Sequence, residues 1–199
     1  MRNNLIIFGC GGHARSVADV ALLGNPNIVI LFVDEKARDG EALFGFPVVK
    51  EYNVENENVF VAIGDNAKRR QLCEIYGSKL VNIISPRAYI GRAVEMGRGV
   101  FVAHGAHIGV GSKIGDFAIV NTNASIDHEC NLGVASAVSP GVVLCGKVTL
   151  GNNTLLGANV SVRDGVTIGH NITVGAGAAV VKNIEKPGVY VGVPAKMKT

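Results

Sequence analysis

The residues of this chain best suited to chemistry are three consecutive ionisable side chains, Asp127, His128 and Glu129, in the stretch NTNASIDHECNLG. A carboxylate that holds one ring nitrogen of a histidine raises the basicity of the other, which favours general base catalysis. His128 follows the aliphatic Ile126 by two residues, so we expect its ring to point outward. The alternative interpretation is a surface histidine in a polar turn.

A glycine stands at the spacing that such a base would use. Gly146 follows His128 by 18 residues. In a coil of 18 residues it would lie directly above the histidine, with no side chain to obstruct a ligand and an N–H free to meet a developing oxyanion. A base beneath a vacant niche with a hydrogen-bond donor is suited to acyl transfer.

The element that must position these residues is a six-residue repeat that follows residue 85. Nine of the residues that follow its anchors are Gly, which suits a short strand and a turn. Three units make a triangular coil, and stacked coils pair their backbones about 4.8 Å apart. The anchors are sixteen aliphatic residues: Ile90, Met96, Val102, Ile108, Ile114, Val120, Ile126, Leu132, Val138, Leu144, Leu150, Leu156, Val162, Ile168, Val174 and Val180.

The first 85 residues predict a small α/β unit with a short parallel sheet, because buried strands alternate with helices. Ligands of such sheets bind beyond the carboxyl ends of the strands. That rim would hold the Gly-rich turn GCGGHA, the acids Asp34 and Glu35, and Gly64. The turn could bind a phosphate at a helix N-terminus, although it lacks the third glycine of a full dinucleotide motif. His13 could cap this helix or contact a phosphate, and the two acids could bind a ribose or a base or be solvated.

Length and composition indicate an ordinary globular protein. The chain has 199 residues, of which 18% are charged and 48% apolar, with a net charge of +3. The scattered basic residues are a poor match to duplex nucleic acid, and no apolar run approaches a membrane span of roughly 20 residues. Four cysteines lack disulfide or metal spacing, so we expect a cytoplasmic protein with reduced thiols. We predict three parts: residues 1–85, 86–182 and a turn-rich tail, 183–199.

Two further patterns are weaker. His104 and His107 lie close together, but no third metal ligand stands at a suitable coil offset, so we expect no metal site. Small residues at one outward corner could form a smooth groove for a long thin ligand, or reflect only the preference of tight turns. These residues are Pro140, Ala158 and Ala176, with Ala137 just before the first.

From end to end, the chain resembles the NeuD/PglD-type sugar O/N-acetyltransferases. These bacterial enzymes acetylate a sialic acid or the 4-amino group of a nucleotide-linked 4-amino-4,6-dideoxysugar. The resemblance rests on GCGGHA, FVDE, AIGDN, NTNASIDHEC within the repeat, and the closing GVYVGVPAK. It implies an α/β, Rossmann-like N-terminal domain followed by a left-handed parallel β-helix, assembled as a homotrimer.

The resemblance also implies the roles of individual residues. His128 would be the general base, Glu129 its partner, and the N–H of Gly146 the donor to the thioester oxygen. The nucleotide would be held by Gly11, Gly12, His13, Asp34, Glu35 and Gly64. Acetyl-CoA, the co-substrate, would lie between two subunits near Ala137, Ala158 and Ala176. Family members often carry Asp at the position of Glu35, and some differ at Gly11, so the choice of base stays open.

We therefore expect direct attack of a sugar 4-amino group on acetyl-CoA, with UDP as the first choice of nucleotide and glycan biosynthesis as the setting. One alternative is O-acetylation of sialic acid by the same chemistry. Another is a non-catalytic trimer that binds a nucleotide.

Overall fold

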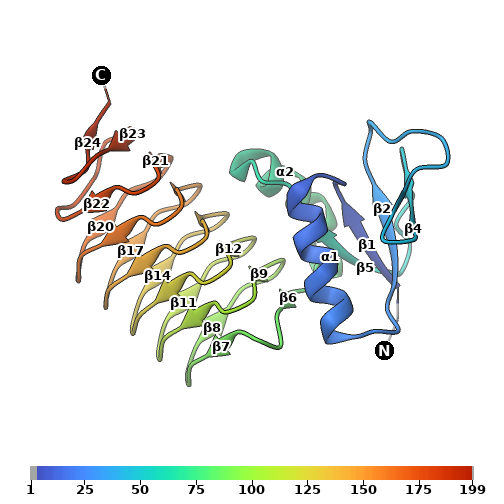
Figure 1. Cartoon of the computed structure of the whole chain (residues 1–199), viewed down its shortest axis with the longest axis horizontal. Helices are drawn as coiled ribbons and strands as arrows, with labels where there is room; N and C mark the ends of the chain where they lie inside the picture. The colour runs from blue at the N-terminus through green and yellow to red at the C-terminus, as the bar shows by residue number, and fades with distance from the viewer. Residues whose placement is uncertain (1–3, 199) are drawn as a thin grey trace.

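The computed structural model describes residues 4–198, and its N-terminal unit is built on a five-stranded sheet of order β3-β4-β2-β1-β5 (Figure 1). Only β3 runs antiparallel to its neighbour. Two helices, α1 (Gly12–Gly24) and α2 (Asn66–Tyr76), accompany the sheet, and a short 3₁₀ helix, η1 (Gly77–Lys79), follows α2. The strands are β1 (Asn4–Phe8), β2 (Val29–Val33), β3 (Ala42–Leu43), β4 (Phe46–Val49) and β5 (Asn58–Val61). The parallel α/β unit is confirmed.

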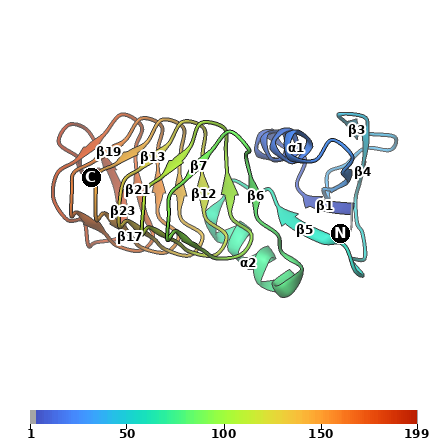
Figure 2. The same cartoon turned by 90° about the horizontal axis from the view of Figure 1, so that it is seen from below.

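The rest of the chain winds into a three-sided β-solenoid, whose coils stack along one axis (Figure 2). The first face contains β7 (Tyr89–Ile90), β10 (His107–Ile108), β13 (Ser125–Ile126), β16 (Val143–Leu144), β19 (Ser161–Val162) and β22 (Ala179–Val180). The second face contains β8 (Glu95–Met96), β11 (Lys113–Ile114), β14 (Asn131–Leu132), β17 (Thr149–Leu150) and β20 (Thr167–Ile168). The third face contains β6 (Ile83–Ile84), β9 (Phe101–Val102), β12 (Ile119–Val120), β15 (Ala137–Val138), β18 (Leu155–Leu156), β21 (Ile172–Val174), β23 (Gly188–Val191) and β24 (Lys196–Met197).

The predicted coil of 18 residues is confirmed by the strand register. Ile108 pairs with Ile126, and Ile126 with Leu144, each step being one coil. These side chains are fully buried in a ladder along the axis of the prism. Each coil therefore covers its apolar side chains with the coils above and below it.

Both ends of the solenoid extend beyond the predicted limits. At the start, β6 already pairs with β9, so the third face begins before residue 85. At the end, β23 pairs parallel with β21 and β24 pairs antiparallel with β23. The tail thus adds two strands to the third face, although its two prolines exclude a helix as expected.

The N-terminal unit packs against the early coils of the third face, where Phe101, Ile119 and Ala137 share a buried cluster with residues of α1 and β1. A fully buried arginine of α2, Arg69, joins the two parts. Its guanidinium donates to five acceptors, the carbonyls of Phe117, Ala135, Ile63 and Gly64 and the side-chain oxygen of Asn66, at 2.8–3.3 Å. Burial lowers the pKa of Arg69 to about 10, and all five N–H groups have partners.

Candidate active site

His128 lies in the turn between β13 and β14, at the corner where the first and second faces meet; we call this the first corner. The backbone N–H of His128 donates to Asp127 Oδ1 at 2.7 Å. Its ring Nδ1 lies 3.1 Å from Glu129 Oε2. A bond from Nδ1–H to this carboxylate leaves the lone pair of Nε2 free to accept a proton. The side chain is 42% exposed, so the ring is accessible from solvent, as predicted.

Gly146 lies one coil above His128 on the same corner, and its lack of a side chain lets the imidazole approach its backbone closely; we call this place the niche. A Cβ at this position would lie 2.5 Å from His128 Nε2, 2.6 Å from His128 Cε1 and 2.9 Å from Asp164 Oδ2. The φ of Gly146 is outside the left-handed region, so its backbone does not require glycine. Glycine is needed at position 146 because a side chain there would collide with the His128 ring.

Hydrogen bonds between turns hold this corner in register. Lys147 N–H donates to His128 O, and Gly165 N–H donates to Gly146 O, both at 2.9 Å. Within residues 4–198, the N–H of Gly146 has no hydrogen-bond partner. An imidazole and a backbone N–H without a partner therefore lie on adjacent coils of the first corner, and acyl transfer to a nucleophile uses groups of these two kinds.

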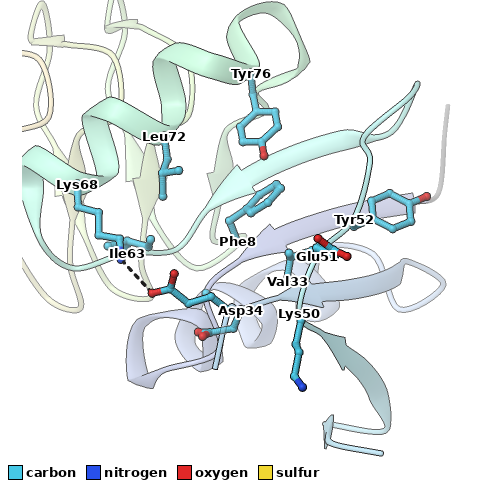
Figure 3. A pocket seen from close by; sticks show the side chains of 12 residues that line it. Phe8, Val33, Asp34, Lys50, Glu51, Tyr52, Ile63, Lys68, Leu72 and Tyr76 are labelled. Carbon is cyan, nitrogen blue, oxygen red and sulfur yellow. Dashed lines mark ion pairs between the residues drawn. The ribbon is translucent and has the colours of Figure 1, made fainter. Parts of the chain in front are cut away.

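A cavity of about 340 Å³ opens at the rim of the N-terminal sheet (Figure 3). One wall is apolar, and in it the rings of Phe8 and Tyr76 stack with their centroids 4.6 Å apart. Acids and lysines line the rest of the cavity, and Lys68 of α2 forms an ion pair of 3.7 Å with Glu35. The charged lining residues are Asp34, Glu35, Lys50, Glu51 and Lys68. A flat base fits an aromatic wall that faces polar groups.

Asp34 and Glu35, which the sequence places at the rim of the sheet, line this cavity, but its helical side was not predicted. Lys68, Leu72 and Tyr76 are spaced by four residues, so they share one face of α2. The four-residue spacing of these residues in the sequence could have indicated that they line one face of a helix.

Asp34 is already engaged within its own unit. Its carboxylate accepts from the backbone N–H of Cys10 and of Lys36, each at 3.0 Å. It therefore ties the Gly-rich turn to the end of β2. Gly11, Gly12 and Gly64 are exposed, with open space where a Cβ would lie. They leave the backbone accessible to a ligand.

Comparisons with known proteins agree with this architecture. The family described as PglD N-terminal domain matches residues 4–76, and the hexapeptide repeat of succinyl-transferase matches residues 123–154 and 147–182. The acetyltransferase domain of PglB from Neisseria gonorrhoeae is 31% identical, with 99% of this chain and 100% of that chain covered and a TM-score of 0.93. The chain belongs to the NeuD/PglD-type sugar acetyltransferases.

Another solved member of this acetyltransferase family is PerB from Caulobacter crescentus, in complex with CoA and GDP-perosamine. It is 36% identical, with 98% of this chain and 97% of that chain covered and a TM-score of 0.87. A curated relative, uncharacterized protein L142 of Acanthamoeba polyphaga mimivirus, is 35% identical over 115 residues. The match spans 55% of this chain but only 23% of that protein.

Two residues assigned through the NeuD/PglD resemblance lie where they were not expected. The ring of His13 packs edge-on against Phe101 at 5.1 Å, in the junction between the two parts of the chain. Its Nε2 is buried without a partner among the described residues, and desolvation, followed by the charge of Arg69, lowers the pKa of His13 to about 4. His13 neither caps α1 nor faces the open side of the turn.

Ala137 does not lie at the outward corner where it was expected together with Ala158 and Ala176. Ala158 and Ala176 lie at the corner between the third and first faces, but Ala137 is in β15 and stacks on Leu155. It is 5% exposed, beneath the N-terminal unit. A ligand in an open groove at that corner would therefore not reach Ala137.

The other histidines have different surroundings. His104 lies between Ser85 Oγ, 2.7 Å from Nδ1, and Asp19 Oδ2, 2.9 Å from Nε2. His107 stacks on Tyr89. Within residues 4–198, no three His, Cys, Asp or Glu side chains converge as metal ligands, and no helix is long and apolar enough to cross a bilayer.

Proposed function

We propose that this chain transfers the acetyl group of acetyl-CoA to the amino group of a nucleotide-linked sugar in glycan biosynthesis. Our first choice of acceptor is the 4-amino group of a UDP-linked 4-amino-4,6-dideoxysugar. The observation that supports this most strongly is the close approach of His128 Nε2 to Gly146, a glycine whose backbone N–H has no partner within residues 4–198. PerB, which was solved with CoA and GDP-perosamine, offers a precedent for a nucleotide-linked amino sugar.

In this mechanism the amine attacks the thioester directly. His128 Nε2 takes a proton from the amine, while Glu129 stabilises the imidazolium through Nδ1. The nitrogen bonds to the carbonyl carbon, and the Gly146 N–H stabilises the oxyanion. The carbon–sulfur bond then breaks, and the CoA sulfur takes the proton from His128. The nitrogen keeps one proton in the amide product, and an acceptor that binds as an ammonium ion releases one further proton to solvent before it attacks. Because both substrates are held together, no acyl-enzyme is required.

We further propose that the working unit is a homotrimer. His128 lies on the first corner of the prism, whereas Ala158 and Ala176 lie on the corner between the third and first faces. Acetyl-CoA that lies between two chains could contact both sets. Exposed apolar residues beside the first corner, Val110 at 52% and Val143 at 43%, are suited to an interface with a second copy.

A guanine nucleotide is the second candidate for the carrier. The Glu35 and Glu51 carboxylates at the cavity can accept hydrogen bonds from the N–H groups of guanine. UDP, TDP and GDP should therefore be compared by thermal shift, since the cognate nucleotide raises the melting temperature most.

The reaction itself is tested by incubating the protein with acetyl-CoA and a panel of nucleotide-linked 4-amino sugars, free sialic acid and CMP-sialic acid. Mass spectrometry should find acetyl on the amine of one nucleotide sugar. Acetylation of sialic acid alone would favour the O-acetyltransferase alternative. No transfer to any acceptor would favour a nucleotide-binding scaffold.

A further inference from the structure

Asp164 lies one coil above Gly146 on the first corner, in the turn that links β19 to β20. Its Oδ2 is 2.9 Å from the point where a Cβ of Gly146 would lie, and His128 Nε2 is 2.5 Å from the same point. The carboxylate and the imidazole therefore both approach Gly146 at the same niche. No sequence motif singles out this aspartate.

The Asp164 carboxylate has no role in the fold itself. It is exposed, and among residues 4–198 it accepts no hydrogen bond and forms no ion pair. Asp127 differs, because its side chain accepts the backbone N–H of His128. Glu129 differs as well, because it contacts the His128 ring. Within residues 4–198, Asp164 therefore borders the niche with both of its carboxylate oxygens unengaged.

A free carboxylate at this place has a clear chemical use. A primary amine on a saturated carbon is largely protonated at neutral pH, as the lysine amine is. An ammonium group in the niche could donate to Asp164 and to His128 Nε2 at once. A hydroxyl group has no positive charge and only one proton to donate.

We propose that Asp164 anchors the ammonium group of the acceptor sugar and so selects amines over hydroxyls. This inference rests on the proposed N-acetyltransferase function. Asp164 holds the acceptor nitrogen beside His128, while the proton transfer stays with His128. Loss of the Asp164 carboxylate should therefore weaken the binding of the acceptor amine and leave the binding of acetyl-CoA unchanged.

The test compares wild type, Asp164→Asn and the control Glu185→Gln, which removes an exposed carboxylate away from the niche. Each protein is assayed with the amino sugar that wild type acetylates and with the matching hydroxyl sugar. For Asp164→Asn we expect the amine KM to rise about tenfold or more, which corresponds to about 1.4 kcal/mol. The acetyl-CoA KM should stay within about twofold, and the amine-to-hydroxyl ratio of kcat/KM should fall. Glu185→Gln should match wild type in all three values.

An unchanged amine KM and selectivity in a folded Asp164→Asn protein, with wild type active, would overturn this inference alone. A rise confined to the acetyl-CoA KM would also overturn it, because Asp164 would then act on acetyl-CoA and not on the sugar amine. Melting curves of the three proteins establish that each is folded. If wild type acetylates no amine at all, the proposed function fails, and that failure is visible in the wild-type assay by itself.

Discussion

At the scale of single residues, the site depends on a side chain that is missing. Gly146 allows the imidazole of His128 and the carboxylate of Asp164 to approach one point in space. Both of these side chains are accessible at the surface, so they can move if the point is filled. Within residues 4–198, the backbone N–H of the same glycine has no hydrogen-bond partner.

Gly146→Ala should therefore lower turnover strongly while the protein stays folded. The new methyl group would lie 2.5 Å from His128 Nε2, so the ring must leave its position. We expect kcat to fall at least about 10²-fold, the usual scale for losing a general base. Steady-state kinetics and a melting curve measure both effects, with Gly24→Ala, which meets only Pro86 at 4.0 Å, as the control. Normal turnover would mean that the niche is not used.

A second residue-scale prediction concerns His13. Its pKa is about 4 in the folded protein and about 6.5 in a model peptide, so the unfolded chain binds the proton more tightly. Its contribution to stability is complete above pH 6.5 and is lost as the pH falls toward 4, at up to about 1.4 kcal/mol per pH unit. Urea unfolding from pH 7 to pH 4 should show a shallower decline for His13→Phe than for wild type. Parallel declines would contradict the burial of this ring.

At the scale of elements, the glycines of the repeat have a different task from Gly146. Gly133 ends a short strand beneath the next coil, and a Cβ there would lie 2.6 Å from backbone atoms of Gly151 and Asn152. Backbone that is hydrogen-bonded on both sides cannot move aside as a surface histidine can. The stacking distance itself therefore requires glycine at this position.

Gly133→Ala should accordingly destabilise the solenoid and not act on catalysis directly. Overpacking of this kind typically costs about 1–3 kcal/mol, and a clash with backbone lies at the upper end or beyond. Denaturant unfolding, compared with the same Gly24→Ala control, measures the loss. Full stability together with lost turnover would contradict this prediction, because it would mean that the coils can move apart at little cost in free energy of unfolding.

The elements differ in how far the sequence could predict them. The solenoid was predictable because its period is local: each aliphatic anchor and each coil register follows from spacing alone. The niche at Gly146 followed from the same spacing. The strands of the tail were not predictable from spacing. β23 pairs with β21, which lies at the open edge of the third face once the preceding coils have formed.

The residues that sequence reasoning misplaced are those whose surroundings depend on how the two parts of the chain meet. His13 and Ala137 look available in the sequence, but both are covered where the N-terminal unit packs on the third face. Arg69 looks like one of three consecutive basic residues, yet it is fully buried. No period or motif reports such a contact between distant segments.

At the scale of the whole molecule, Arg69 fixes the N-terminal unit to the solenoid. Arg69→Met would leave five acceptors without their donors, two of them on the coils at Phe117 and Ala135. Leaving a buried acceptor without its donor typically costs about 1–3 kcal/mol for each group. We expect a loss of this order and a separate early transition of the N-terminal unit in denaturant unfolding.

The neighbouring arginine is the matched control for this prediction. Arg70 pairs with Glu74 one helical turn away, and its side chain is 39% exposed. Arg70→Met should change the free energy of unfolding by about 0.5 kcal/mol or less. Similar losses in the two variants would contradict the role of Arg69 in joining the parts.

The central claim is that His128, beneath Gly146, takes the proton from the acceptor amine. The most direct measurement is the rate of acetyl transfer by His128→Ala, together with its Kd for acetyl-CoA, beside the exposed control His107→Ala. We predict that kcat of His128→Ala falls about 10²- to 10⁴-fold, that acetyl-CoA binds as it does to wild type, and that His107→Ala behaves normally. Near-normal turnover by His128→Ala would contradict the account.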